Sequence, residues 1–172
     1  MITSKYNWKN IEKEPDNGFF ELTKKEKLTE LASQILYSRG VDTAEKLIQF
    51  LSTDLSQLHD PYLLHDMDKA VNRIRQAIEN YEQILVYGDY DADGMTSASI
   101  MKEALEMLGA EAQVYLPNRF TDGYGPNESV YKYFIEQQNV SLIITVDNGV
   151  AGNEAIAYAQ SQGVDVIVTD HH

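Results

Sequence analysis

The stretch that decides the fold reads ILVYGDYDADG and occupies residues 84–94. Its first four residues are apolar, as expected for a strand that is buried on both faces. A glycine and alternating aspartates follow, and Ala98, Met101 and Leu105 then recur at helical spacing. A buried strand, a tight turn and a helix in this order are typical of the units that build parallel sheets.

Two later segments repeat the pattern of an apolar run that ends in polar residues. LIITV is followed by DNG over residues 142–149, and VDVIVT is followed by DHH over residues 164–172. A shorter strand is predicted at 112–116, and helical spacing recurs at 130–137 and 155–160. Because strands alternate with helices, residues 81–172 are predicted to form an α/β domain with a parallel β-sheet flanked by helices.

The first 80 residues follow a different pattern and predict a small, mainly helical N-terminal region. Thr23 and Glu26 have the spacing of a capping box, Leu31 and Ile35 follow at helical spacing, and Gly40 would end that helix. We therefore expect two regions, a helical one over 1–80 and the sheet domain over 81–172.

The polar residues that follow the three long strands predict a metal site. Ligands of open parallel sheets bind beyond the carboxyl ends of the strands, so these side chains are expected to converge. The residues are Asp89, Asp91, Asp93, Asp147, Asp170, His171 and His172. So many carboxylates repel one another unless cations neutralise them, and carboxylates joined by imidazole suit Mg²⁺ or Mn²⁺. The pattern indicates a metal-dependent hydrolytic site.

Other interpretations of the first motif explain less. An EF-hand loop needs a glutamate at its twelfth position, where this chain has Ile100, and a preceding helix instead of a strand. A phosphatase loop of the haloacid-dehalogenase type resembles residues 91–94, but Met95 departs from that pattern and residues 170–172 stay unexplained. A turn rich in aspartate that merely caps the next helix would account for one motif and not for three.

Composition limits the possible partners. The chain has 172 residues, a net charge of −13 and no cysteine, and beyond residue 80 three basic residues face 14 acidic ones. Such an acidic region repels a polyanion, so bound metal ions or a more basic region would have to attract a nucleic acid. No apolar run is long enough to cross a bilayer and residues 1–10 lack the apolar stretch of a signal peptide, so we expect a cytoplasmic protein without membrane association.

One basic residue beyond residue 80 is a candidate for substrate binding. Arg119 follows a predicted strand and enters a glycine-rich loop. A guanidinium binds phosphate oxygens with two parallel hydrogen bonds, so Arg119 is either a phosphate contact or a surface residue. Tyr124 in the same loop could stack on a base or pack against the protein.

Four motifs in order resemble the DHH phosphoesterase superfamily, most of all its RecJ branch of exonucleases specific for single strands. The motifs are GDYDADGMT (88–96), PNR with GYG (117–125), VDNG (146–149) and TDHH (169–172). The region from Trp8 to Val71 also resembles the segment that precedes the first motif in this branch. The resemblance therefore covers nearly the whole chain.

The resemblance implies a DHH-type domain that binds two Mn²⁺ or Mg²⁺ ions. It implies 5′-to-3′ exonuclease action on single-stranded DNA in repair and recombination, by two-metal hydrolysis of phosphodiester bonds. Metal ligands would be Asp89, Asp91, Asp93, Asp147 and His171, with Asp147 between both ions. Asp91, Asp93, Asp147, His171 and His172 would be the catalytic residues. His172 would face the substrate phosphate, as would Arg119, and Asp170 would orient a histidine.

The same resemblance predicts that part of the enzyme lies downstream. A further metal-binding aspartate, an associated domain and a nucleic-acid-binding domain would follow His172. We therefore expect this chain to be a truncated, N-terminal part that is inactive alone, with most single-stranded DNA contacts in the missing domains. The alternative is a related phosphatase or phosphodiesterase that acts on pyrophosphate, cyclic dinucleotides or short oligonucleotides.

Overall fold

The computed structural model describes residues 14–171, so Trp8 and His172 lie outside the described residues. Contacts divide the chain into two compact units, of which the first ends at Asp60 and the second begins at Pro61. Each unit is described by itself below. Among the described residues, none of the helices combines the length and the apolar character that a membrane crossing requires.

The first unit confirms the expected helical character and corrects one helix start. It contains α1 (Asn17–Lys25), α2 (Glu30–Ser38), α3 (Ala44–Leu51) and a short 3₁₀ turn, η1 (Leu55–Gln57). Thr23 does not cap a helix: it lies inside α1, and its hydroxyl accepts a hydrogen bond from Ser33 Oγ at 2.7 Å. Thr29 caps α2 instead, accepting from the amide of Ala32 at 3.2 Å.

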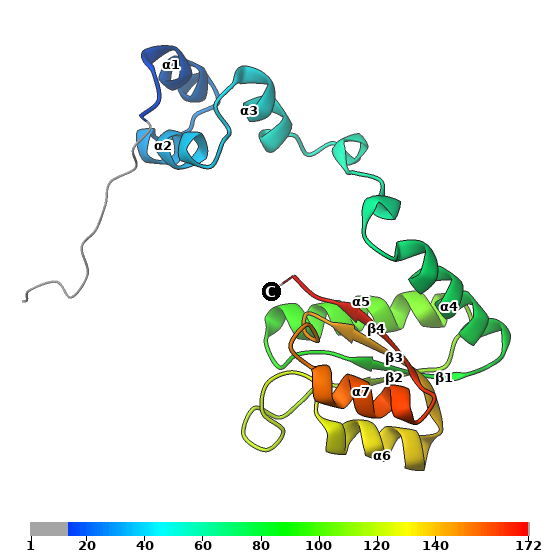
Figure 1. Cartoon of the computed structure of the whole chain (residues 1–172). Coiled ribbons are helices and arrows are strands. Elements are labelled where there is room, and N and C mark those ends of the chain that lie inside the picture. The colour runs from blue at the N-terminus through cyan, green and yellow to red at the C-terminus, as the bar shows by residue number, and fades with distance from the viewer. Residues whose placement is uncertain (1–13, 172) are drawn as a thin grey trace, which may run out of the picture. The chain divides into compact units, whose positions relative to one another are not determined.

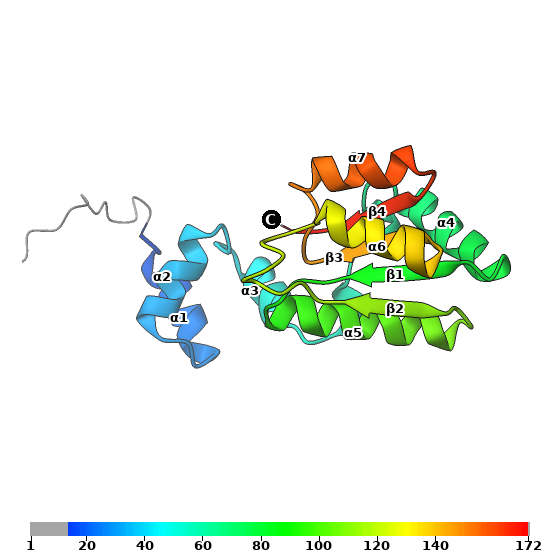
Figure 2. The same cartoon turned by 90° about the horizontal axis from the view of Figure 1, so that it is seen from below.

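The second unit is the predicted α/β domain. Its elements are η2 (Pro61–Leu63), α4 (Met67–Glu79), β1 (Gln83–Tyr87), α5 (Ala92–Met107), β2 (Ala112–Tyr115), α6 (Glu128–Gln138), β3 (Val140–Val146), α7 (Asn153–Ser161) and β4 (Asp165–Thr169). The four strands are all parallel and lie in the order β2-β1-β3-β4 (Figures 1 and 2). The prediction of a parallel sheet flanked by helices is confirmed.

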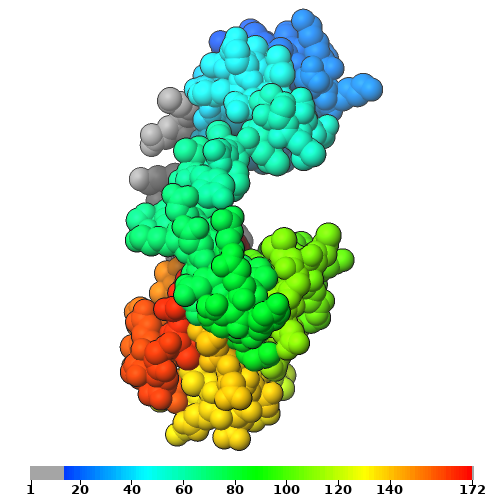
Figure 3. Space-filling view, turned by 90° about the vertical axis from the view of Figure 1, so that its right-hand side faces the viewer, coloured from blue at the N-terminus to red at the C-terminus, as the bar shows by residue number. Residues whose placement is uncertain are grey.

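Helices cover both faces of this sheet. On one face α6 and α7 pack over Leu85, Tyr87 and Ile143, and Figure 3 shows α6 in yellow beside α7 in orange-red. On the other face α4 and α5 pack over Ile84 and Ile144. Burial from both sides explains why the central strands β1 and β3 are nearly continuous apolar runs without alternation.

Helix α4 packs on the sheet, which differs from the predicted boundary at residue 80. Ala77 is fully buried with the strand residues, and Arg73 forms ion pairs with Glu82 and with Asp165 of β4. An amphipathic stripe shows that a helix has a buried face, but not whether that face meets helices or a sheet. The sequence pattern therefore did not indicate that α4 packs on the sheet.

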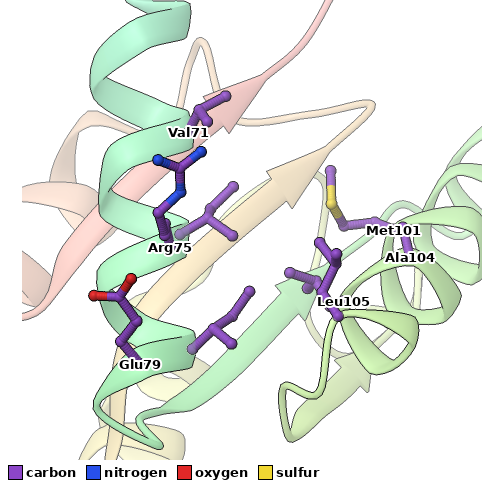
Figure 4. Close-up of a pocket in the computed structure, with 9 residues that line it drawn as sticks. Val71, Arg75, Glu79, Met101, Ala104 and Leu105 are labelled. Atoms are coloured by element: carbon purple, nitrogen blue, oxygen red, sulfur yellow. The ribbon is translucent and has the colours of Figure 1, made fainter.

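A cavity of about 480 Å³ lies between α4 and α5. Figure 4 shows Val71 of α4 on one side, with Met101 and Leu105 of α5 on the other. Arg75 and Glu79 of α4 also line it. This cavity contains none of the predicted site residues.

Candidate metal centre

The turn between β1 and α5 holds three of the predicted ligands. Asp89 is buried, and its Oδ1 accepts a hydrogen bond from the amide of Tyr90 at 2.7 Å. Asp91 is the N-cap of α5, and its Oδ1 accepts from the amide of Gly94 at 2.9 Å. Asp93 lies in the first turn of α5 and is exposed. Negative charge at a helix N-terminus is favourable, which offsets part of the repulsion between these carboxylates.

Gly94 allows the start of α5 to lie directly against Asp89. A Cβ at position 94 would stand 2.5 Å from the Asp89 nitrogen and from its Cβ. No side chain tolerates such a contact with backbone, so the close approach of the two acidic segments depends on this glycine.

The end of β3 presents Asp147 in an unusual backbone conformation. Its φ angle is +62°, in the left-handed region that non-glycine residues rarely occupy, and only 7% of the residue is exposed. The amide of Asp147 donates to the Thr169 carbonyl at 2.9 Å, and Thr145 Oγ1 donates to the Asn148 carbonyl at 2.7 Å. These bonds offset the strain and fix the direction of the carboxylate.

Asn148 ties this turn to the neighbouring strand. The residue is fully buried, and its Nδ2 donates to the carbonyls of Val146 at 3.0 Å and Tyr87 at 3.4 Å. Tyr87 ends β1, so a single amide joins the loops that carry Asp89 and Asp147.

The end of β4 completes the cluster. Asp170 Oδ2 accepts from the amide of Val150 at 2.9 Å, and its Oδ1 accepts from the amide of His171 at 2.7 Å. His171 Nε2 lies 2.8 Å from Asp147 Oδ1. Asp170 thus holds the turn that brings His171 against Asp147, in keeping with an orienting role.

The structure brings all five predicted metal ligands together in two groups. Ligand atoms of Asp89, Asp91 and Asp147 lie within 4.8 Å of one another, as do those of Asp93, Asp147 and His171. Asp147 belongs to both groups. Its Oδ2 is buried without a hydrogen-bond partner among the described residues, which is costly for a carboxylate and is relieved by a cation. The donor set of carboxylates and one imidazole therefore fits Mg²⁺ or Mn²⁺.

The loop after β2 lies beside these groups and is firmly anchored. Asp122 Oδ2 accepts from the Tyr115 hydroxyl at 2.6 Å and from the amide of Asn118 at 2.7 Å, and the Tyr87 hydroxyl donates to the Gly125 carbonyl at 2.9 Å. The Tyr115 hydroxyl and the Asn118 amide lower the pKa of Asp122. Burial and the Asp122 carboxylate raise the pKa of Tyr115 to about 12.

This loop carries Arg119, the candidate phosphate contact, and Tyr124, for which the sequence left base stacking and packing open. Arg119 is exposed, and its Cζ lies 5.4 Å from the centre of the Tyr90 ring. Tyr124 is exposed as well, and its pKa is raised by partial burial and by the carboxylates of Asp89, Asp170 and Asp147. Both side chains therefore flank the acidic cluster.

Two hollows lie near the end of β4. One of about 190 Å³ is lined by Tyr124, Pro126 and Gly149 among others, and one of about 520 Å³ by Ile100, Asp147 and His171 among others. Both are lined by Asp170 as well. The larger hollow therefore reaches two of the candidate ligands, Asp147 and His171.

Sequence reasoning missed three residues that organise the site. Tyr90 contacts Arg119, Asn148 joins two loops and Asp122 folds the loop that carries Arg119. Tyr90 and Asn148 lie inside the quoted motifs, and this position was the one indication in the sequence that they belong to the site. Their contacts could not be predicted because they join residues that are distant in sequence. Asp122 lies in the loop that the sequence marked only as rich in glycine, so nothing indicated that its carboxylate would anchor the loop.

Comparisons with known proteins agree with this geometry. Residues 83–172 match the family model described as "DHH family, N-terminal domain". The single-stranded-DNA-specific exonuclease RecJ of Bacillus subtilis is 43% identical over all 172 residues, and that of Escherichia coli is 38% identical over 146 residues, 84% of this chain. This chain spans only 22% and 24% of their respective lengths.

Solved structures of RecJ exonucleases also resemble this chain. A crystal structure of exonuclease RecJ bound to manganese superposes with a TM-score of 0.59 at 35% identity, over 63% of this chain and 28% of that one. RecJ from Thermus thermophilus in complex with Mn²⁺ superposes with a TM-score of 0.60 at 26% identity, over 90% of this chain and 21% of that one. The chain belongs to the DHH family, and its residues 83–172 match the N-terminal domain of that family.

Proposed function

We propose that this chain supplies the metal-binding part of the phosphodiester-hydrolysing site of an exonuclease that degrades single-stranded DNA from its 5′ end in repair and recombination. The observation that carries the proposal is the Asp147 carboxylate, which two separate groups of candidate ligands share at the carboxyl ends of parallel strands. Similarity to the single-stranded-DNA-specific exonuclease RecJ of Bacillus subtilis over all 172 residues supports the choice of substrate. Because such an enzyme needs access to DNA, we propose a cytoplasmic location.

We assign the ligands of two Mn²⁺ or Mg²⁺ ions from the two groups. Asp89, Asp91 and Asp147 would hold one ion, and Asp93, Asp147 and His171 the other. When bound, two such ions neutralise the carboxylates and stabilise the charge that develops during phosphodiester hydrolysis.

The remaining residues of the chain orient these ligands and the substrate. Asp170 and Asn148 hold the turns that carry His171 and Asp147. Arg119 would bind a phosphate of the DNA strand, which the acidic cluster alone would repel. His172, which follows His171 directly and lies outside the described residues, would face the phosphate as well.

The test is release of nucleotides from a 5′-phosphorylated single-stranded oligonucleotide in the presence of Mn²⁺. This chain is compared with a chain extended to the length of its curated relatives. Labels at either end of the oligonucleotide report the polarity. We expect 5′-to-3′ digestion by the extended chain only, because the 172-residue chain spans about a fifth of those relatives.

Matched variants identify the site. Asp147→Asn removes one charge with almost no change in volume and should abolish digestion, whereas Glu103→Gln, at an exposed position of α5, should leave it unchanged. Hydrolysis of pyrophosphate or dinucleotides without digestion of longer strands would contradict the proposal. The protein would then act as a different kind of DHH phosphodiesterase or phosphatase.

A further inference from the structure

Arg119 is held by an aromatic ring in a region crowded with carboxylates. Its Cζ lies 5.4 Å from the centre of the Tyr90 ring, and Tyr90 is half-buried between the candidate ligands Asp89 and Asp91. A guanidinium over the face of a tyrosine ring is attracted by the negative charge of that face. Tyr90 therefore fixes where the Arg119 guanidinium lies relative to the metal centre.

The pairing with a ring leaves the charge of Arg119 available. Beyond residue 80 the chain has three basic residues, and the other two, Lys102 and Lys132, each pair with a glutamate one helical turn further on. Within residues 14–171, Arg119 forms no ion pair. The ring neutralises none of the guanidinium charge, and the N–H donors of a guanidinium match the oxygens of a phosphate.

The backbone on both sides of Arg119 is fixed as well. The Asn118 amide donates to Asp122 Oδ2 at 2.7 Å, and the Phe120 amide donates to Asn118 Oδ1 at 2.9 Å. The long side chain is then the main remaining source of freedom, and immobilising such a chain costs entropy when a ligand binds. A ring that holds it beforehand lowers that cost.

We infer that Tyr90 is a positioning residue that holds Arg119 ready to bind a phosphate of single-stranded DNA beside the metal centre. The inference rests on the proposed function and deepens it. A carboxylate partner in place of Tyr90 would neutralise Arg119 and compete with phosphate, whereas an uncharged ring orients the guanidinium without competing.

A double-mutant cycle tests the inference in the chain extended to the length of its relatives. The substrate is 5′-phosphorylated single-stranded DNA with saturating Mn²⁺. We expect Arg119→Ala to raise KM by roughly 10-fold or more, because charged hydrogen bonds to phosphate are lost. Tyr90→Leu should raise KM by about 3-fold, as expected for an exposed interaction of this type. The value of kcat should not change in either variant.

The cycle also separates positioning from general support of the fold. In the Arg119→Ala background, Tyr90→Leu should have no further effect on KM, because the ring then has nothing to hold. Tyr90→Phe keeps the ring, so its KM should stay within about 2-fold of the KM of the unmutated protein. Tyr81→Leu, which replaces an exposed tyrosine before β1, is the matched control without effect.

Three results would overturn the inference. They are an unchanged KM in Tyr90→Leu, equal effects of Tyr90→Leu with and without Arg119, and a weaker Mn²⁺ affinity that accounts for the whole effect of Tyr90→Leu. If the unchanged protein hydrolyses pyrophosphate and not DNA, the proposed function fails. The same cycle on the KM for pyrophosphate then decides the inference: retained coupling between Tyr90 and Arg119 supports it, and additive effects contradict it.

Discussion

Substitution of Gly94 by alanine should damage both the stability of the sheet domain and its affinity for metal. The added Cβ would stand 2.5 Å from the Asp89 nitrogen and 2.6 Å from its Cα, atoms that cannot rotate away. The first turn of α5 must therefore move from the β1 end, and Asp91 and Asp93 move with it.

The magnitude follows from two opposing effects. Overpacking of this kind destabilises by about 1–3 kcal/mol, while alanine gains up to about 1 kcal/mol over glycine inside a helix. Because the clash is with backbone, we expect a net loss of about 1–2 kcal/mol, which lowers the urea midpoint by about 1 M. Displaced carboxylates should also weaken Mn²⁺ binding by at least about 10-fold, as expected when a metal site loses its geometry.

Far-UV circular dichroism in urea and calorimetric titration with Mn²⁺ measure the two effects. Gly18→Ala is the matched control, because this glycine also lies near the start of a helix and its added Cβ meets only the Asp16 carboxylate, at 3.3 Å. It should change neither the unfolding of the sheet domain nor the Mn²⁺ affinity. A Gly94→Ala protein with unchanged stability and unchanged Mn²⁺ affinity would refute the reasoning.

Three further predictions follow from the contacts of single residues. Burial raises the pKa of Glu82, but hydrogen bonds from Arg73, Ser141 and Asn80 outweigh this effect and lower the pKa overall. The carboxylate therefore stabilises the fold at pH values above its unfolded pKa, and this stabilisation is lost as the pH falls through the folded pKa. Glu82→Gln should therefore destabilise by about 1–3 kcal/mol at pH 7 and by progressively less as the pH falls below the usual pKa of a glutamate, measured by urea unfolding over a series of pH values. Asp91→Asn keeps a good N-cap for α5, so the stability of the variant should stay within about 1 kcal/mol of that of the unmutated protein. Its Mn²⁺-dependent hydrolysis should be lost, and retained hydrolysis would contradict the assignment of Asp91 as a ligand. Tyr115→Phe removes the hydroxyl that donates to Asp122 and should raise KM for DNA more than it lowers kcat, which steady-state kinetics would report.

Much of the sheet domain could be predicted because its central strands, β1 and β3, are buried on both faces. The apolar runs that contain Val86, Ile144 and Ile167 leave few alternatives to parallel strands, and Gly109 and Gly163 follow the ends of α5 and α7. The helical region was less predictable. Thr23 and Glu26 have the spacing of a capping box, yet Asp16 caps a helix that begins earlier and contains Thr23.

The site was predictable in outline for a topological reason. Parallel strands end at one edge of the sheet, so aspartates that follow three strands must lie close together. The sequence could not indicate that Asp147 takes a left-handed conformation, or that Asn148 bonds to the end of β1. These contacts, like the cation–π contact between Arg119 and Tyr90, join distant segments and depend on the completed fold.

The measurement that tests the central claim most directly is the number of Mn²⁺ ions bound, determined by calorimetric titration of the extended chain and its variants. We predict two ions for the unchanged protein, loss of both in Asp147→Asn, and loss of one in Asp93→Asn, because only Asp147 belongs to both ligand groups. Circular dichroism confirms that each variant is folded. An Asp147→Asn protein that still binds two ions with unchanged affinity would contradict the account.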